Sequence, residues 1–275
     1  MIKYKQNLHT HSTFCDGKDT PESTVLRAIE LGFDSIGFSS HSPSSKYSLS
    51  LHQDKVNAYK DEVYRLKEVY KDKIKVYCGL EEELYSDEGF DGFEYIIGAV
   101  HYLKKDGELL NIDVSNPDDL KTRVDKYFDG SYLKIAKHYY ETVCKLHTES
   151  RYKIDFIAHF DIIAKFFEKV DFIDQDSKIY RGYALDALKF ITEKGYPLEI
   201  NTGGCARGYR SIPYPAPFIL KELNKMGGRI LISSDCHDNS KLDLMFNDSL
   251  KLAKECGFKE VQIFDGKGFI PVPID

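Results

Sequence analysis

An amphipathic helix, then a glycine, then a short β-rich run form a unit that recurs along this sequence. In its first copy, Thr20-Pro21-Glu22 combines a helix-capping residue, a proline suited to the first helical position and an acid of the first turn. Gly32 is expected to end this helix, and residues 34–38 are predicted to follow as a strand. The same order returns three times: at Gly195 before residues 197–200, at Gly227 before residues 230–232 and at Gly257 before residues 261–264. This alternation predicts βα units around a parallel sheet.

Four further apolar runs are predicted to be buried strands, which brings the strand candidates to about eight. These runs are residues 2–8, 74–78, 95–99 and 154–158. Long helices are predicted for residues 54–71 and for residues 117–145, the latter with a break at Asp129-Gly130. Because no Pro/Gly/Ser-rich linker interrupts the chain, residues 1–275 are expected to form one domain. A barrel-like α/β domain accounts best for the pattern, and an open doubly wound sheet is the alternative.

Charge and motif content exclude several classes of function. The net charge is −6 with both signs interspersed, which does not resemble a nucleic-acid-binding surface. No GxGxxG or GxxxxGKS/T motif follows a predicted strand, so a dinucleotide site or a P-loop is not expected. There is no basic-then-apolar signal segment and no apolar run long enough to span a membrane, so we expect a cytoplasmic protein without membrane partners.

Six cysteines form no CxxC pair and are expected to be free thiols in a reducing compartment. Cys15, Cys205 and Cys236 adjoin the motifs described next, and whether any of them contacts a metal stays open.

Histidines and carboxylates follow the predicted strands at comparable positions. His9 and His11 stand at the end of the first strand, and side chains two apart in a strand point to the same face. The later strands are followed by His41; Glu81; His101; His159 and Asp161; Asn201 and then Arg207; and Asp235 and His237. In a βα barrel the carboxyl ends of all strands form one face, on which the active site is built. We therefore expect these side chains to converge there, together with Asp16.

Six of the nine histidines belong to this set, whereas His52, His138 and His147 are expected at the surface. Imidazole and carboxylate together suit zinc, iron or manganese, and the sequence does not choose among them. A catalytic zinc site uses about three protein ligands, so this larger set indicates two or three metals that share a carboxylate. Of the run Glu81-Glu82-Glu83, at most two acids can face inward, because successive side chains in a strand alternate in direction.

At the level of whole motifs, the sequence resembles the polymerase-and-histidinol-phosphatase (PHP) superfamily and, within it, the histidinol-phosphate phosphatases. The matching stretches run from residue 9 to residue 237 and are His9-Thr10-His11-Ser12, Ser40-His41-Ser42-Pro43, Gly79-Leu80-Glu81, Gly98-Ala99-Val100-His101, Ala158-His159-Phe160-Asp161, Asn201-Thr202-Gly203-Gly204 and Ser234-Asp235-Cys236-His237. The resemblance implies a distorted (β/α)7, TIM-like barrel with a trinuclear metal centre.

Carried over by motif, the resemblance implies three groups of metal ligands. One metal would lie on His9, His11, Glu81 and Asp235; a second on Glu81, His101 and His159; and a third on Asp16, His41 and His237. Glu81 would bridge the first two. The resemblance also implies cationic residues for a substrate phosphate, here Arg207 and Lys165, the latter where relatives show an arginine. Gly203 stands where the family commonly has a serine, which puts a role for that hydroxyl in doubt.

The function implied by the resemblance is a metal-dependent phosphomonoesterase that hydrolyses L-histidinol phosphate in histidine biosynthesis. Its partner would be a small phosphate ester, and the sequence predicts no oligomeric state. Asp161 or His237 is expected to assist the leaving group. Two alternatives remain open. One is a different hydrolase on the same metals, such as a nucleotide phosphoesterase or an amidohydrolase-like enzyme, and the other is a non-enzymatic metal-binding module.

Overall fold

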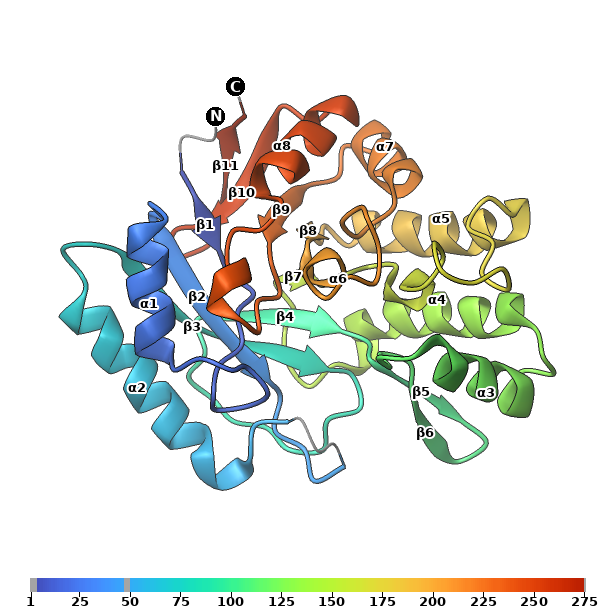
Figure 1. Cartoon of the computed structure of the whole chain (residues 1–275), viewed down its shortest axis with the longest axis horizontal. Helices are drawn as coiled ribbons and strands as arrows, with labels where there is room; N and C mark the ends of the chain where they lie inside the picture. The colour runs from blue at the N-terminus through green and yellow to red at the C-terminus, as the bar shows by residue number, and fades with distance from the viewer. Residues whose placement is uncertain (1–3, 47–49, 275) are drawn as a thin grey trace.

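Seven parallel strands form the central sheet of the computed structural model, which describes residues 4–46 and 50–274. The strands are β1 Gln6–Asn7, β2 Ser35–His41, β3 Lys75–Glu83, β4 Tyr95–Ala99, β7 Phe156–Ile157, β8 Leu198–Asn201 and β9 Ile230–Ser233, and they are neighbours in that order (Figure 1). The first strand is shorter than the predicted run of residues 2–8, of which Ile2 and Lys3 lie outside the described residues.

The two outer strands of the sheet, β1 and β9, continue into segments that meet. Thr10 and Cys236 form a parallel bridge. The amide of His11 donates to the carbonyl oxygen of Cys236 at 2.8 Å, and the amide of Cys236 donates to that of His9 at 3.1 Å. These bonds nearly close the sheet into a barrel. The predicted distorted (β/α)7 barrel is confirmed, and the open doubly wound sheet is excluded.

Helices cover the outside of the barrel (Figure 1). They are α1 Pro21–Glu30, α2 Val56–Val69, α3 Pro117–Tyr127, α4 Tyr132–Glu149, α5 Lys178–Glu193, α7 Pro217–Lys225 and α8 Phe246–Glu255, with 3-10 turns at Gln53–Lys55, Ile162–Ala164 and Asn239–Lys241. The short α6 Gly203–Ala206 lies instead at the carboxyl end of β8. The start of α1 is as predicted, since Thr20 caps it by accepting from the amide of Ser23. The predicted break at Asp129-Gly130 separates α3 from α4, and both residues have positive φ angles, 51° and 69°.

The strand predicted for residues 261–264 is real, but it does not join the barrel. It is part of β10 Glu260–Phe264, which pairs antiparallel with β11 Phe269–Pro273. Because β1 and β9 already meet, the barrel offers no free edge for an eighth parallel strand. Instead, Gln6 at the start of β1 exchanges two side-chain hydrogen bonds with the backbone of Phe264, at 2.9 and 2.7 Å. The hairpin is thereby fixed at the amino-terminal end of the barrel.

Aromatic side chains fill the barrel interior below the site. Tyr95 is 1% exposed, and its hydroxyl lies 2.6 Å from the carbonyl oxygen of Leu8 and 3.1 Å from that of Phe38. The ring fits because two neighbouring strands carry glycine beside it. A Cβ atom on Gly79 would lie 2.2 Å from the tyrosine ring, and one on Gly37 would lie 2.3 Å from its hydroxyl. Side chains thus fill the barrel interior at this level, and an active site can form only at the carboxyl ends of the strands.

A small antiparallel hairpin follows β4 at that carboxyl end, formed by β5 Tyr102–Lys105 and β6 Glu108–Asn111. The hairpin was not predicted, although the turn Asp106-Gly107 carries the signature of a tight hairpin turn. Both turn residues have positive φ angles, 50° and 85°. Among the described residues, no helix combines the length and apolar character needed to cross a bilayer.

Candidate metal centre

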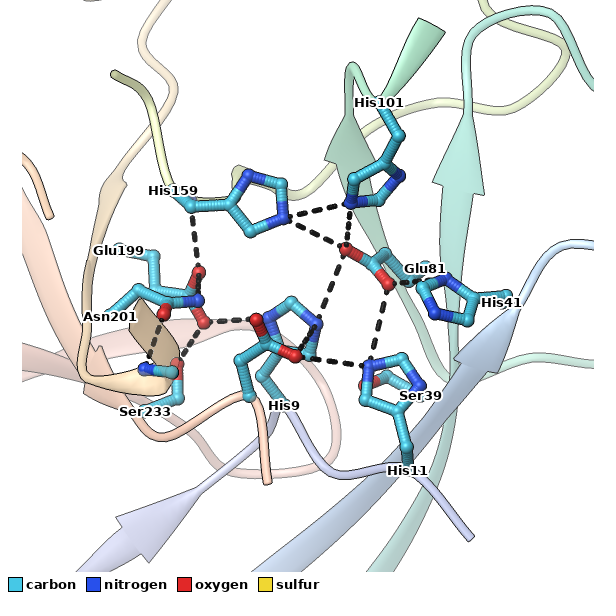
Figure 2. Close-up of polar contacts among 12 residues, drawn as sticks. His9, His11, Ser39, His41, Glu81, His101, His159, Glu199, Asn201 and Ser233 are labelled. Atoms are coloured by element: carbon cyan, nitrogen blue, oxygen red, sulfur yellow. Dashed lines mark hydrogen bonds and ion pairs between the residues drawn. The ribbon is translucent and has the colours of Figure 1, made fainter. Parts of the chain in front are cut away.

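The predicted ligands do converge at the carboxyl ends of the strands. Figure 2 shows His9, His11, His41, His101 and His159 arranged around the carboxylate of Glu81. Three groups of ligand atoms each lie within 4.8 Å of one another: His9, His11 and Asp235; His41, Glu81 and His101; and His11, Asp16, His41 and His237. Two of the positions lie within strands rather than beyond them, because β2 runs on to His41 and β3 runs on past Glu81.

Glu81 is the centre of the cluster and is 1% exposed. Its Oε1 lies 3.3 Å from His9 Nε2, 3.4 Å from His101 Nε2 and 3.1 Å from His159 Nε2. Its Oε2 lies 2.8 Å from His41 Nδ1 and 3.5 Å from His11 Nε2. The two oxygens therefore face different sets of imidazoles, as a carboxylate shared between metals would.

Asp235 joins the cluster from the segment after β9. Its Oδ1 lies 3.3 Å from His11 Nε2, 3.7 Å from His9 Nε2 and 3.4 Å from His237 Nδ1. Asp235 has a positive φ angle of 49°, a strained backbone conformation for a residue with a side chain. The strain is held in place by the bonds between the β1 and β9 segments described above.

Asp16 brings the loop before α1 to the same cluster. Its Oδ1 lies 3.5 Å from His41 Nε2 and 3.6 Å from His11 Nδ1, and its Oδ2 lies 3.1 Å from His237 Nε2. Burial would raise the pKa of Asp16, but His41 and His237 beside it lower that pKa below its usual value. Asp16 is therefore an ionised carboxylate available as a ligand.

Several buried atoms of the cluster have no hydrogen-bond partner. They are His9 Nε2, His11 Nε2, Asp16 Oδ1 and Glu81 Oε2. Buried polar atoms are almost always paired in folded proteins, so a group of orphans pointing at one another needs an explanation. Imidazole nitrogens and carboxylate oxygens are the donors that zinc, iron and manganese prefer. The residues present fit a metal centre.

The electrostatics of the cluster agree with this donor set. Burial alone would raise the pKa of Glu81, but His9, His41 and His101 around it lower that pKa well below its usual value. Burial and the neighbouring His237 and His41 lower the pKa of His11 to about 3. His11 is therefore neutral at pH 7 and Glu81 ionised, and these are the forms that bind a metal.

Glu199 supports the centre, although the sequence predicts no more for it than a place in the strand of residues 197–200. It is fully buried on β8, and its Oε1 lies 2.8 Å from His9 Nδ1 and accepts from the hydroxyl of Ser233. Its Oε2 accepts from the amide of His159 at 3.1 Å and from Asn201 Nδ2 at 2.8 Å. A carboxylate on the second ring nitrogen fixes the orientation and tautomer of a ligating histidine. The signal in the sequence was a charge inside an otherwise apolar strand.

Glu83 plays the same part for His101. Its Oε2 lies 3.2 Å from His101 Nδ1 and accepts from the amide of the same residue at 2.6 Å. Glu81 and Glu83 are two apart on β3, whereas Glu82 between them has no hydrogen-bond partner for either oxygen among the described residues. Burial raises the pKa of Glu82 to about 8.

A cavity of about 180 Å³ opens onto the cluster. Its lining includes five of the candidate ligands, Asp16, His41, His101, Asp235 and His237, together with Arg207 and Lys165. Arg207 Nη1 and Nη2 lie 3.3 and 3.2 Å from the two carboxylate oxygens of Asp235, and Nη2 donates to His237 Nδ1 at 2.8 Å. The guanidinium thus lies directly beside the candidate metal ligands.

Lys165 also lies on the cavity, but its ammonium already has partners. It lies 2.5 Å from Asp113 Oδ1, donates to the carbonyl oxygen of Val114 at 2.9 Å and stands 4.3 Å from the centre of the Tyr209 ring. Its placement agrees with a cation near the substrate, and its pairing with Asp113 was not expected.

Asp161 is placed away from the cavity, which removes the basis for its expected role at the leaving group. Its side chain is fully buried, and its Oδ2 accepts from the amide of Ala216 at 2.9 Å and lies 3.8 Å from Arg210 Nη1. Asp161 therefore ties the segment after β7 to the start of α7. The sequence motif was misleading because Asp161 already occupies the N-cap position of the 3-10 turn Ile162–Ala164, so the alternation of side chains along a strand no longer applies to it.

The cysteines and the other three histidines do not belong to the candidate ligand groups. All six cysteines are free thiols. Cys15 Sγ lies 3.4 Å from His11 Nδ1, whereas Cys236 Sγ contacts the carbonyl oxygen of Asp238 and none of the three candidate ligand groups contains a cysteine. His52 and His147 are exposed and His138 is half-buried.

Comparison with known proteins agrees with this geometry. The histidinol-phosphatase of Bacillus subtilis is 24% identical, over 85% of this chain and 93% of its own length. A solved structure from Listeria monocytogenes covers 89% of this chain and 99% of its own, with a TM-score of 0.77 at 21% identity. Histidinol phosphate phosphatase from Lactococcus lactis, solved with zinc, L-histidinol and phosphate, covers 97% of this chain and 98% of its own, with a TM-score of 0.68 at 22% identity.

The PHP domain model matches residues 7–203, which carry seven of the nine candidate metal ligands. Arg207 and the last barrel strand, with Asp235 and His237 after it, lie outside the match. The match covers well over half of the chain, and the barrel and its ligand set agree with it. The chain belongs to the PHP domain family.

Proposed function

We propose that this protein is a metal-dependent phosphomonoesterase that hydrolyses L-histidinol phosphate to L-histidinol and inorganic phosphate. The observation that carries the proposal is the convergence of six histidines with the carboxylates of Asp16, Glu81 and Asp235, beside a cavity that Arg207 also lines. A complete ligand set of this kind argues against a module that has lost its chemistry. The names of the relatives over nearly the full chain support the choice of substrate.

We propose that the centre holds three divalent ions and that Glu81 is shared between two of them. We propose zinc, because the Lactococcus lactis protein was solved with it. Divalent metal in such a centre supplies a Lewis acid for the phosphate and lowers the pKa of the attacking water. His9, His11, Glu81 and Asp235 would hold one ion, Glu81, His101 and His159 a second, and Asp16, His41 and His237 a third.

Arg207 would bind the phosphate oxygens. Its guanidinium lies on the cavity wall beside Asp235 and His237, so a phosphate placed against the candidate ligands would also meet this fork of donors. Two parallel hydrogen bonds to a phosphate fix its orientation and neutralise charge that shifts during the reaction. Lys165 would add a second positive charge on the same cavity, as a point charge rather than a fork.

The ester bond that breaks leaves an alkoxide, which must be protonated or otherwise stabilised. Of the two residues considered for this step, only His237 lies on the cavity. Its Nδ1 lies 2.8 Å from Arg207 Nη2 and its Nε2 lies 3.1 Å from Asp16 Oδ2, so it stands between the proposed phosphate-binding arginine and the candidate metal ligands. We propose His237, rather than Asp161, as the residue next to the leaving oxygen.

A steady-state comparison of substrates tests the proposal. With zinc supplied, kcat/KM for L-histidinol phosphate should exceed that for several nucleotides and for p-nitrophenyl phosphate by at least ~10²-fold, because a site built for polar groups rejects esters that lack them. Elemental analysis of the same protein should give more than one metal per chain. A nucleotide that outranks histidinol phosphate would contradict the substrate, and no phosphate release from any ester would contradict the enzyme.

Arg207→Lys tests the phosphate-binding role in the same assay. We expect kcat/KM to fall by at least ~10-fold, since lysine keeps the charge but not the two-pronged geometry. The matched control is Arg27→Lys on α1, which changes an exposed arginine paired with Glu30. Equal kinetics for both variants would remove Arg207 from the site.

A further inference from the structure

One acid on the cavity has no part in the proposed metal centre. Asp113 follows the β5–β6 hairpin and lines the cavity together with Tyr102, Asn111 and Ser115 from the same stretch of chain. The other acids of the cavity, Asp16, Glu83 and Asp235, all contact histidines of the cluster. Asp113 is not among the residues of the three candidate ligand groups.

The carboxylate of Asp113 is held in place on one side and open on the other. Lys165 Nζ lies 2.5 Å from its Oδ1, and the backbone amide of Asp113 donates to Asn111 Oδ1 at 2.8 Å. Lys165 is 3% exposed, whereas the side chain of Asp113 is 30% exposed. Within residues 4–46 and 50–274, Lys165 is the only ion-pair partner of Asp113. Lys165 therefore orients the carboxylate of Asp113, and the rest of that carboxylate is accessible from the cavity.

This carboxylate is ionised. Burial would raise the pKa of Asp113, but the positive charges of Lys165, His101 and Arg207 lower it below its usual value. Asp113 and Arg207 line the same cavity. A negative group at that place repels a phosphate dianion and weakens binding of any ester that carries no compensating cation.

We propose that Asp113 binds an ammonium group of the substrate and makes the site selective for phosphate esters that carry an amine next to the ester carbon. The inference rests on the proposed function and specifies it. In L-histidinol phosphate the amine is on the carbon adjacent to the CH2–O–P unit. When Arg207 and the candidate metal ligands hold the phosphate, the ammonium lies within a few ångströms of that phosphate. A carboxylate on the same cavity, such as that of Asp113, can then reach the ammonium. The open face of Asp113 meets it, and Lys165 keeps the carboxylate oriented.

The test compares two substrates that differ only in the amine. L-histidinol phosphate and 3-(imidazol-4-yl)propyl phosphate are assayed with zinc supplied, and the ratio of their kcat/KM values is measured for each protein. In the wild type the ratio should be about 10- to 100-fold in favour of the amine, the range of a hydrogen bond to a charged group. In Asp113→Asn the ratio should fall by at least ~10-fold, and in Asp113→Glu it should be partly restored.

Matched controls separate recognition from support of the fold. Asp106→Asn removes a charge from the exposed tip of the same hairpin and should leave the ratio unchanged. If Asp113 only holds Lys165, Asp113→Asn should slow both substrates equally, and an unchanged ratio would overturn the inference. A wild-type ratio near one would overturn it too, while leaving the phosphatase intact. If neither imidazole ester is hydrolysed faster than p-nitrophenyl phosphate, the proposed function fails and the inference with it.

Discussion

Glu81 is the residue that touches most of the candidate centre, because its two oxygens face five imidazoles. We therefore expect Glu81→Gln to lower kcat by at least ~10²-fold, the scale of losing one strong electrostatic contributor. It should also remove more metal per chain than His159→Ala, which changes a ligand of one ion only. Steady-state kinetics with elemental analysis of both variants would measure this.

The neighbouring acid provides the control. Glu82→Gln makes the same chemical change one position along β3, at a side chain that contacts none of the candidate ligand groups. It should retain activity and metal content. The reverse outcome, with Glu82→Gln inactive and Glu81→Gln active, would show that the wrong acid has been assigned as the shared ligand.

Glu199 acts through other residues, so its removal should show up first in metal affinity. It contacts His9 Nδ1 and the backbone of His159, and it is itself held by Ser233 and Asn201 (Figure 2). Loss of such a supporting carboxylate typically weakens metal binding by about 10- to 100-fold. We expect Glu199→Gln to show this shift in a competition with a chelator, with near-normal kcat once zinc is in excess. Unchanged metal affinity would reduce Glu199 to a packing residue.

At the scale of elements, the strands are spaced by what lies inside the barrel. Gly79 on β3 leaves room for the ring of Tyr95 on β4, and a Cβ atom there would lie 2.2 Å from it. Neither β3 nor β4 can move away from the other without disturbing the packed barrel, so the added methyl group would clash with the ring. Gly79→Ala should therefore lower the free energy of unfolding by about 1–3 kcal/mol. In a Tyr95→Leu background the extra cost should largely disappear, as a double-mutant cycle in denaturant would detect.

Gly182 on α5 is the matched control for this change. A Cβ atom on Gly182 would meet no atom within 4 Å, and its backbone is helical. Gly182→Ala should therefore raise the free energy of unfolding by about 0.5–1 kcal/mol. A similar loss of stability from both substitutions would contradict the conclusion that Gly79 is needed to leave room for the ring of Tyr95.

The sequence predicted the positions of helices and strands better than it predicted how the strands pair and what the buried acids contact. Apolar runs and capping residues are local signals, and they located α1, the break between α3 and α4, and all seven barrel strands. Strand pairing is not local, so β10 was placed in the barrel although the sheet closes without it. The histidines of the cluster were predictable because histidine recurs at the strand ends. Glu199 and Asp113 were not, since what they contact lies far away along the chain.

At the scale of the whole molecule, the candidate centre concentrates buried ionisable groups on one face of the barrel. The free energy of unfolding should therefore depend on pH and on bound metal. Burial would lower the pKa of His9, but the carboxylates of Glu199, Glu81 and Asp235 raise it well above its usual value. Glu81 and Asp16 likewise raise the pKa of His41, against the effect of burial. In the metal-free protein these two histidines hold protons that the unfolded chain would have released.

The sign of the pH dependence follows from that difference. Above about pH 6.5, the unfolded histidine is neutral, whereas His9 and His41 in the folded protein stay protonated up to their raised pKa values. The folded state then binds more protons, so its stability falls as pH rises, by up to about 1.4 kcal/mol per pH unit for each group. Glu82, whose pKa burial raises to about 8, acts in the same direction up to that pH.

Metal reverses this behaviour, because ions bind the neutral form of histidine and compete with the protons. We expect the Tm of chelator-treated protein to decrease between about pH 6.5 and 8.5. The rise in Tm on adding zinc should grow over the same interval, since binding to the folded state stabilises it by mass action. Thermal unfolding with and without zinc, at constant ionic strength, measures both slopes. The His9→Gln variant should flatten the metal-free slope, and a metal-free Tm that increases with pH would show that the cluster does not hold these protons in the folded protein.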